Sequence, residues 1–318
     1  MTESAAATLT GVTMAPATIA GSPGTKVAIV TGGGSGIGEA LCLELARRGT
    51  RVVVADIDGD GARRVAAAIA QAGGQASAYT VDVSREPDVR HLVERIAATH
   101  GRLDYLFNNA GIVIEGDARD LTVDHWRRVL DVDLYGVLYG MLAAYPIMAR
   151  QGFGHIVNTA SAGAFFPDPG NAPYCTAKHA LIGLSLSLRL EGIDLGVRVS
   201  AACPGYVRTN IFENASVVNM PTRAAMHGRA REQAAGLPRR MMTADRAAQV
   251  ILEGVARDKP VILFPAGIRW ARRVYYLFPR LIERQVQHWH RRRAYRPATP
   301  QRPENLTARH GLAGPAER

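Results

Sequence analysis

The sequence has little cysteine and no long apolar run. Its three cysteines, Cys42, Cys175 and Cys203, stand far apart, so no pair has the spacing of a metal site or of a disulfide framework. No run of about 18 apolar residues is present, and we therefore expect no transmembrane helix. No Lys or Arg precedes Lys26, so the first residues lack the basic segment of a secretory signal. These absences predict a cytoplasmic protein in a reducing compartment, with no bound metal ion.

Acidic residues are scarce near the C-terminal end, and the net positive charge of the chain is therefore concentrated there. The chain of 318 residues has a net charge of +10. Residues 268–318 contain 12 Arg, no Lys and three Glu, which gives this segment alone a net charge of +9. The rest of the chain is therefore almost neutral, and the basic isoelectric point belongs to the C-terminal segment.

Short apolar runs alternate with helical patterns from residue 26 to about residue 263. Most of the runs are apolar without alternation, as in parallel strands that are covered on both faces. The pattern predicts an α/β fold, a Rossmann-like doubly wound parallel sheet of about seven strands with helices on both faces. The strand-like runs are Val27–Val30, Val52–Ala55, Ala76–Tyr79, Tyr105–Phe107, His155–Asn158, Val197–Ala202 and Val261–Phe264. The helical stretches lie near 36–48, 59–72, 86–99, 123–150, 172–192 and 243–257.

We expect three parts along the chain. Residues 1–25, rich in Ala, Thr and Ser, are predicted to be a disordered lead-in. Residues 26–266 are predicted to form a single dinucleotide-binding catalytic domain. Within it, a Met-, Arg- and Pro-containing stretch at about 210–242 breaks the alternation and is predicted to be a substrate loop. Residues 267–318 are predicted to be a basic amphipathic extension.

The segment 31–38 reads Thr-Gly-Gly-Gly-Ser-Gly-Ile-Gly and directly follows the apolar run Val27–Val30. A strand that ends in closely spaced glycines before a helix is typical of a dinucleotide-binding turn. The backbone N–H groups can approach a pyrophosphate there, and the helix N-terminus adds partial positive charge. A surface turn is the alternative, but the flanking strand and helix favour nucleotide binding. We expect cofactor contacts from Gly32, Ser35, Gly36, Ile37 and Gly38.

Asp56 ends the second strand-like run, 24 residues after Gly32. At this spacing a carboxylate can accept hydrogen bonds from an adenosine ribose, and it would repel a 2′-phosphate. The alternative is a residue that caps the next helix. With the glycine segment upstream, Asp56 predicts NAD as the cofactor, with NADP less favoured.

Tyr174 and Lys178 are four residues apart, so on a helix their side chains share a face. An ammonium next to a phenol lowers the phenol's pKa, which makes a tyrosine usable as an acid or base. Such a pair on its own is usually a surface feature. Ser161, just past the run His155–Asn158, favours a catalytic group, because strand ends and helix starts meet at the ligand-binding edge of the sheet.

These residues, with Asn108-Asn109-Ala110-Gly111 and Pro204-Gly205, occur in an order and spacing that resembles the short-chain dehydrogenases/reductases over about residues 26–264. The resemblance implies that Tyr174 is the general acid/base and that Ser161 orients the carbonyl. It implies that Lys178 holds the nicotinamide ribose and lowers the pKa of Tyr174. The further cofactor contacts that it implies are Asp82, Val83, Asn109, Ala110, Gly111, Pro204, Gly205, Val207 and Thr209.

Asp133 departs from the family pattern. The resemblance implies that this place holds a fourth catalytic residue, an Asn in a Val-Asn-Leu context, whereas the chain reads Val132-Asp133-Leu134. An Asp can accept from a water that bridges to Lys178, but it cannot donate an amide hydrogen. Its charge would partly offset the effect of Lys178 on Tyr174. A tolerated variant, a shifted pH optimum and a non-catalytic site all remain open.

The implied activity is an NAD(H)-dependent oxidoreductase that interconverts a secondary alcohol and a ketone, or an aldehyde and an alcohol. A lipophilic small-molecule substrate is favoured, because the expected walls of the site are apolar. Two alternatives remain: a 3-oxoacyl reductase acting on acyl chains, and a non-catalytic NAD-binding regulatory protein. Family analogy predicts a homo-oligomer. The expected walls are Ile112, Val113, Ile114, Phe165, Phe166 and the apolar residues of 211–226.

The extension has aromatic and aliphatic residues near helical spacing, with arginines between them, and Pro279 should interrupt any helix there. Such a sequence suits peripheral contact with an anionic membrane surface. A helix packed on the body or on another subunit is the alternative, and nucleic acid is not favoured. We expect the extension to be dispensable for catalysis.

Overall fold

The computed structural model describes residues 24–211, 214–219 and 241–292. Nearly all of the predicted lead-in, most of the predicted substrate loop and residues 293–318 lie outside the described residues. The core is a seven-stranded parallel sheet with the strand order β11-β7-β6-β4-β1-β2-β3, which confirms the predicted fold class. Its strands are β1 (Val27–Thr31), β2 (Arg51–Asp56), β3 (Ala76–Thr80), β4 (Tyr105–Asn108), β6 (Gly154–Thr159), β7 (Val197–Pro204) and β11 (Val261–Phe264).

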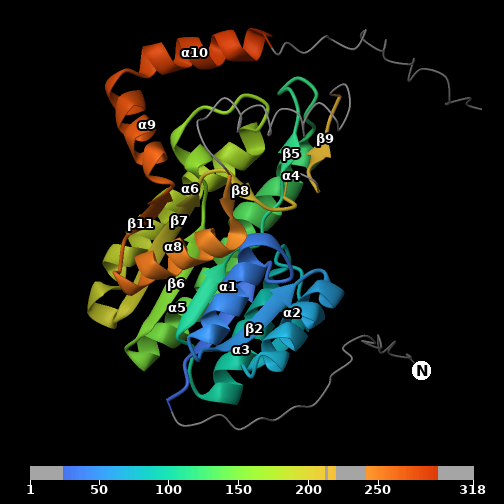
Figure 1. Ribbon diagram of the computed structural model, residues 1–318, viewed down its shortest axis with the longest axis vertical. Coiled ribbons are helices and arrows are strands. Elements are labelled where there is room, and N and C mark those ends of the chain that lie inside the picture. Colours follow the sequence, from blue (N-terminus) through green and yellow to red (C-terminus); the bar gives the residue numbers. More distant parts are fainter. Residues whose placement is uncertain (1–23, 212–213, 220–240, 293–318) are drawn as a thin grey trace, which may run out of the picture.

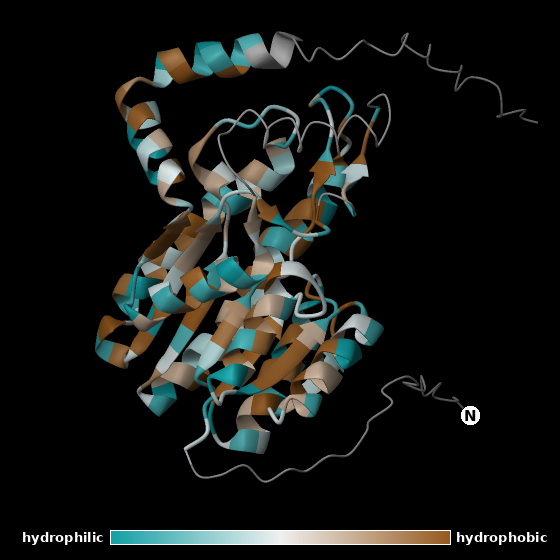
Figure 2. Cartoon of the chain, viewed as in Figure 1, coloured by the Kyte–Doolittle hydropathy of each residue, from teal (hydrophilic) through white to brown (hydrophobic). Residues whose placement is uncertain are grey.

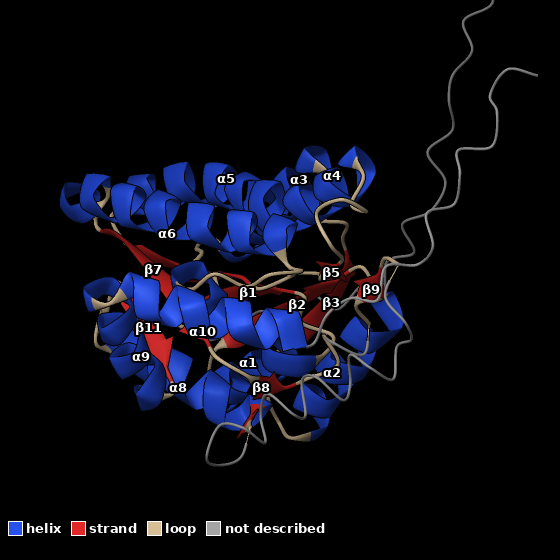
Figure 3. Cartoon of the chain, turned by 90° about the horizontal axis from the view of Figure 1, so that it is seen from above, coloured by secondary structure: helices blue, strands red, loops and turns tan. Residues whose placement is uncertain are grey.

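Helices cover both faces of the sheet (Figure 3). One face carries α3 (Glu86–His100), α4 (Val123–Leu130), α5 (Gly136–Gln151) and α6 (Ala172–Glu191). The other carries α1 (Gly36–Arg47), α2 (Gly59–Gln71) and α8 (Ala244–Ala256). Two further helices follow β11, namely α9 (Ala266–Leu277) and α10 (Pro279–Arg292). The described residues also contain short elements: β5 (Ile114–Glu115), η1 (Asp131–Tyr135), η2 (Ala162–Phe165), η3 (Ile193–Leu195), β8 (Val207–Arg208), β9 (Ser216–Val217) and β10 (Met242–Thr243).

The apolar runs fold as central strands because both of their faces are buried. In β1, Val27 and Ile29 pack into the core under α3 and α5, whereas Ala28 and Val30 pack into the core under α1 and α8. This is the alternation of side chains that a strand imposes. Figure 2 shows the result, with hydrophobic strands between helices that carry hydrophilic residues.

A buried histidine lies inside the sheet. His155 in β6 is only 4% exposed, and its Nε2 lies 2.8 Å from the Ser200 hydroxyl oxygen in β7. Burial lowers the pKa of His155 to about 4. The imidazole is therefore neutral at physiological pH.

One continuous helix, Val123–Gln151, is long and apolar enough by length and composition to cross a bilayer. It belongs to the core of this fold, because Met141, Ala144 and Met148 on it are fully buried and it packs against α3 and β6. The stretch predicted as one helix near 123–150 contains a π-helical turn, η1, in its middle.

The strand order places a ligand site. Along the chain, the sheet starts with β1, builds outward to β3, and then crosses back to β4 on the other side of β1. The segments after β1 and β4 therefore diverge at the carboxyl edge of the sheet, and such a switch point is where open α/β sheets bind ligands.

Candidate active site

The predicted site residues come together at this edge of the sheet, around one cavity of about 1590 Å³. Of the predicted residues, Gly38 and Asp133 do not line the cavity. The predicted residues that do line it are Gly32, Ser35, Gly36, Ile37, Asp56, Asp82, Val83, Asn109, Ala110, Gly111, Ser161, Tyr174, Lys178, Pro204, Gly205, Val207 and Thr209.

The glycine segment forms a tight cradle between β1 and α1. Gly32 and Gly36 have φ angles of +62° and +56°, which side chains rarely tolerate. A Cβ at Gly38 would collide with the backbone oxygen of Gly32, so glycine is needed there for close packing of the helix on the loop. The side chain of Ser35 makes no capping hydrogen bond to α1. The first-turn amides and the helix dipole therefore suit a pyrophosphate group.

Asn109 joins the glycine segment to the end of β4. Its side-chain nitrogen donates to the backbone oxygens of Thr31 and Gly32 at 3.2 and 3.3 Å. The Thr31 hydroxyl in turn accepts from the backbone N–H groups of Asn109 and Ala110 at 3.0 and 3.2 Å. These bonds hold the two diverging segments of the switch point in one arrangement.

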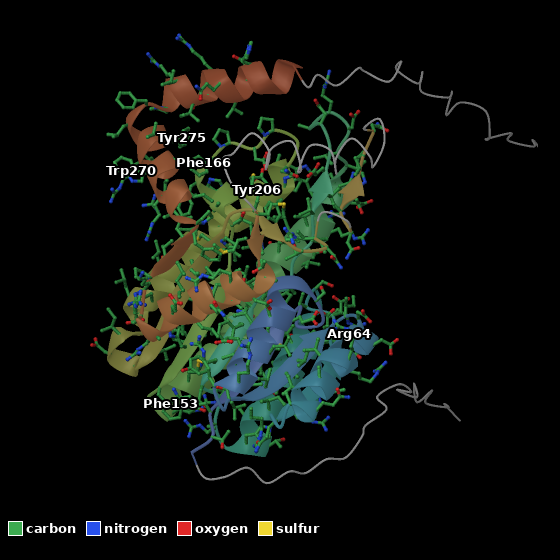
Figure 4. All side chains as sticks on the ribbon, in the orientation of Figure 1. Arg64, Phe153, Phe166, Tyr206, Trp270 and Tyr275 are labelled. Carbon is green, nitrogen blue, oxygen red and sulfur yellow. The ribbon has the colours of Figure 1, made fainter. Side chains whose placement is uncertain are left out.

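Asp56 is fixed at the cavity wall by backbone donors. Its Oδ2 accepts from the N–H of Gly34 at 2.8 Å, and its Oδ1 accepts from the N–H of Asp58 at 2.9 Å. Arg64 on α2, which the sequence did not single out, lines the same wall (Figure 4). Its guanidinium donates to the backbone oxygen of Gly34 at 2.8 Å and pairs with Glu39 at 2.7 Å.

Tyr174 and Lys178 project from the start of α6, one helical turn apart. The Lys178 ammonium nitrogen lies 5.4 Å from the centroid of the Tyr174 ring. Ser161 lies two residues after β6 and caps the start of η2, where its hydroxyl oxygen accepts from the N–H of Gly163 at 3.0 Å. Ser161 is near enough to Tyr174 to lower the pKa of the phenol. A strand end and a helix start thus bring the three side chains together.

Asp133 lies behind Lys178 in the π-helical turn. Its Oδ2 is 3.0 Å from the Lys178 Nζ, and the carboxylate is fully buried. The two groups form a buried ion pair. The other oxygen, Oδ1, accepts from the N–H of Ile112 at 2.8 Å, and Lys178 also donates to the backbone oxygen of Thr159 at 3.0 Å. The direct contact replaces the bridging water that the sequence suggested.

The charges in this cluster oppose one another. Burial raises the pKa of Tyr174 above its usual value, Lys178 acts to lower it, and Asp133 raises it further. The expected lowering by Lys178 is therefore present but is outweighed by burial. Burial also raises the pKa of Asp133 despite the neighbouring ammonium. Burial acts to lower the pKa of Lys178, but Asp133 and Tyr174 more than offset it, so the net shift is upward.

The apolar walls agree only in part with the expected set. Ile112, Val113, Phe166 and Ile211 line the cavity, whereas Ile114 and Phe165 are buried in the fold. Phe212, Met220 and Met226 lie outside the described residues. The sequence did not point to a further group on α9 and α10, namely Ile268, Ala271, Ile282 and Val286. Their helical spacing was visible, but the sequence does not show which surface an amphipathic face covers.

The three cysteines are free. In the described parts of the chain, no group of three or more His, Cys, Asp or Glu could hold a metal ion. The cradle of glycines, the helix N-terminus and the carboxylate at the wall instead fit a dinucleotide.

Comparison with known proteins gives a consistent result. The family model described as short chain dehydrogenase matches residues 26–218. Cyclohexanol dehydrogenase of Acinetobacter sp. (strain SE19) is 39% identical over 199 residues, which cover 61% of this chain and 79% of that protein. Meso-2,3-butanediol dehydrogenase of Serratia marcescens is 37% identical over 186 residues, which cover 58% and 73% of the two chains.

Among solved structures, a short chain dehydrogenase/reductase from Burkholderia phymatum in complex with NAD has a TM-score of 0.72 at 28% identity. The match covers 81% of this chain and 95% of that chain. The seven-stranded sheet, the cavity at its switch point and these similarities agree. The chain belongs to the short-chain dehydrogenase/reductase family, oxidoreductases that act on CH–OH groups.

Proposed function

We propose that the protein interconverts a secondary alcohol and a ketone with NAD(H), using Tyr174 as the general acid/base. The observation that supports this most is the position of Tyr174, Lys178 and Ser161 on the same cavity as the glycine cradle. A bound nicotinamide would then share one space with the phenol that handles the proton. We also propose that residues 26–266 act as one catalytic domain, in the cytoplasm and as a homo-oligomer.

The proton steps follow from the side chains. When bound, NAD(H) would supply the hydride acceptor or donor. In oxidation, the Tyr174 phenolate oxygen takes the proton of the alcohol hydroxyl, and in reduction the phenol returns it. The Ser161 hydroxyl donates to the substrate oxygen and thereby orients the C–O bond of the substrate. Lys178 stabilises the phenolate, and Asp133 holds Lys178 in place.

Different residues along the cavity would hold different parts of the cofactor. The glycine cradle would take the pyrophosphate, and Asp56 would accept from the adenosine ribose hydroxyls. Asp82 and Val83 would flank the adenine, and Val207 and Thr209 would contact the nicotinamide amide. NAD is preferred in this proposal, because a carboxylate at the ribose repels a 2′-phosphate.

A lipophilic substrate is proposed, because the apolar side chains of Ile112, Val113, Phe166 and Ile211 line the same cavity as Tyr174. The relatives named for cyclohexanol and for butanediol give the first compounds to try. The test is turnover of NAD with cyclohexanol, 2-octanol, 2,3-butanediol and a sugar alcohol.

Tyr174→Phe keeps the ring and removes the proton carrier. We expect turnover to fall at least a hundredfold, roughly the range for loss of a general acid/base, while NADH affinity is retained. Fluorescence titration of NADH and steady-state rates measure the two quantities. Near-normal turnover in the variant would contradict the mechanism. A wild-type protein that binds NADH but turns over none of the alcohols would favour a regulatory binding protein instead.

A further inference from the structure

The helices α9 and α10, here called the arm, turn back over the cavity. α9 rises from the end of β11, the chain bends at Phe278, and α10 runs across the top of the molecule (Figure 1). Seen from above, α10 lies over the carboxyl edge of the sheet (Figure 3).

The first helix of the arm, α9, packs against the segment that carries Ser161. The Arg272 guanidinium carbon lies 4.7 Å from the ring centroid of Phe165, at the end of η2. The rings of Tyr275 and Phe166 have centroids 5.8 Å apart, and Figure 4 shows them side by side. At the base of the arm, Ile268 packs so tightly on Gly205 that a Cβ there would collide with it. The arm is thus positioned by segments that line the active site.

The arm presents different chemistry on its two faces. The residues that line the cavity are Ile268 and Ala271 on α9, and Ile282 and Val286 on α10, at spacings of three and four residues. Between them, arginines at positions 269, 273, 280 and 284 are on other faces and do not line the cavity. The apolar stripe therefore faces the same cavity as Tyr174.

The cavity is larger than a single ligand needs. Its volume of about 1590 Å³ exceeds the roughly 300–1,000 Å³ of a usual ligand pocket, which leaves room for a sizeable substrate beside the cofactor. An extended apolar chain or ring system would bury its far end under Ile282 and Val286.

We propose that the arm is the ceiling of the substrate site and selects alcohols and ketones with an extended apolar part. The inference rests on the proposed function and names the substrate class for that same site. It also replaces the expectation that the extension is dispensable for catalysis.

The test measures kcat/KM with NAD for 2-butanol, 2-hexanol, 2-octanol and 2-decanol, using the full chain. Each methylene that the ceiling buries should raise kcat/KM by about three- to fourfold. The variant Ile282→Ser with Val286→Ser should lower the ratio of 2-decanol to 2-butanol at least tenfold, chiefly through KM. The matched control is Leu281→Ser on the same helix, because Leu281 is 55% exposed and does not line the cavity. It should keep the wild-type ratio.

The outcomes separate the two proposals. Turnover of 2-butanol, with no rise of kcat/KM along the alcohol series, would refute the inference about the arm and leave the proposed function standing. An equal ratio in all three proteins would do the same. No turnover of any alcohol would refute the proposed function, and with it the ceiling. NADH affinity is measured alongside, and a loss of affinity in the double variant would place the arm over the cofactor and contradict the inference.

Discussion

Among the individual residues, Asp133 carries the charge that most affects Tyr174 after Lys178. Because Asp133 raises the pKa of the phenol, removing its charge should lower that pKa. For Asp133→Asn we expect the rising limb of the pH–rate profile for alcohol oxidation to move to lower pH. Activity near neutral pH should be retained or raised.

Profiles of kcat/KM between pH 6 and pH 10 measure this shift. Asp194→Asn makes the same chemical change at an exposed position and serves as the control. An unshifted limb in the Asp133→Asn variant would show that the carboxylate does not act on Tyr174. Loss of activity at every pH would show that the Asp133–Lys178 ion pair is itself required.

Asp56 sets the cofactor preference in the proposed function. Asp56→Ala removes the proposed ribose acceptor and also the acceptor for the N–H of Gly34. We expect kcat/KM for NAD to fall and the NADP-to-NAD ratio to rise at least tenfold. Rates with each cofactor at one fixed alcohol concentration give the ratio. A wild-type enzyme that already prefers NADP would contradict the role of Asp56.

Residues differ in how well the sequence predicts them. The glycine segment and the Tyr174–Lys178 pair are local, because spacing along one turn or helix brings their atoms together. Arg64 could not be found this way, since it reaches Gly34 from 30 positions away. The same holds for Ile282 and Val286, whose place depends on how the bend at Phe278 directs α10.

At the scale of elements, apolar runs predicted the strands closely, because each central strand is buried on both faces. The run His155–Asn158, for example, became β6 (Gly154–Thr159). The prediction that Pro279 interrupts the C-terminal helix is confirmed, since α10 begins at this residue. The π-helical turn η1 was not predicted, because one inserted residue leaves the hydrophobic pattern of a long helix almost unchanged.

The outer side of the arm carries the exposed apolar residues on which the predicted membrane contact would depend. Trp270, Tyr276, Leu277 and Phe278 are each at least 59% exposed, and arginines flank them. Figure 4 shows Trp270 pointing away from the body. We expect weak binding to vesicles that contain anionic lipid, and loss of this binding as salt shortens the Debye length from about 10 Å at 0.1 M to about 3 Å at 1 M.

Co-sedimentation of the full chain with anionic and neutral vesicles is the measurement. Leu277→Ser with Phe278→Ser should weaken binding, whereas Leu190→Ser, at a residue 69% exposed on α6, should not. Equal sedimentation of all three proteins with both lipids would remove the membrane prediction.

At the scale of the whole molecule, the strand order decides which parts depend on each other. The cofactor end of the cavity is built by β1, β2 and their helices, and the catalytic end by β4, β6 and α6. The arm continues from β11, the edge strand on the catalytic side. Changes in the arm should therefore affect the substrate more than the cofactor.

The neutral His155 between β6 and β7 makes the fold sensitive to acid. Its pKa is about 4 in the folded chain, against 6.5 as its ordinary value. Between these two values the unfolded chain binds a proton that the folded chain does not, so we expect the contribution of His155 to stability to be fully present above pH 6.5 and to be lost as the pH drops toward 4. The loss amounts to about 3 kcal/mol.

Urea unfolding at pH 7 and at pH 4.5 measures this loss. His155→Gln should show a smaller fall in midpoint than the wild type, and His91→Gln, at an exposed position, should not differ from it. An equal fall in all three would place the acid sensitivity elsewhere. If His155 is the cause, mild acid weakens the sheet at β6 and β7, and β6 is the strand that leads into the segment with Ser161.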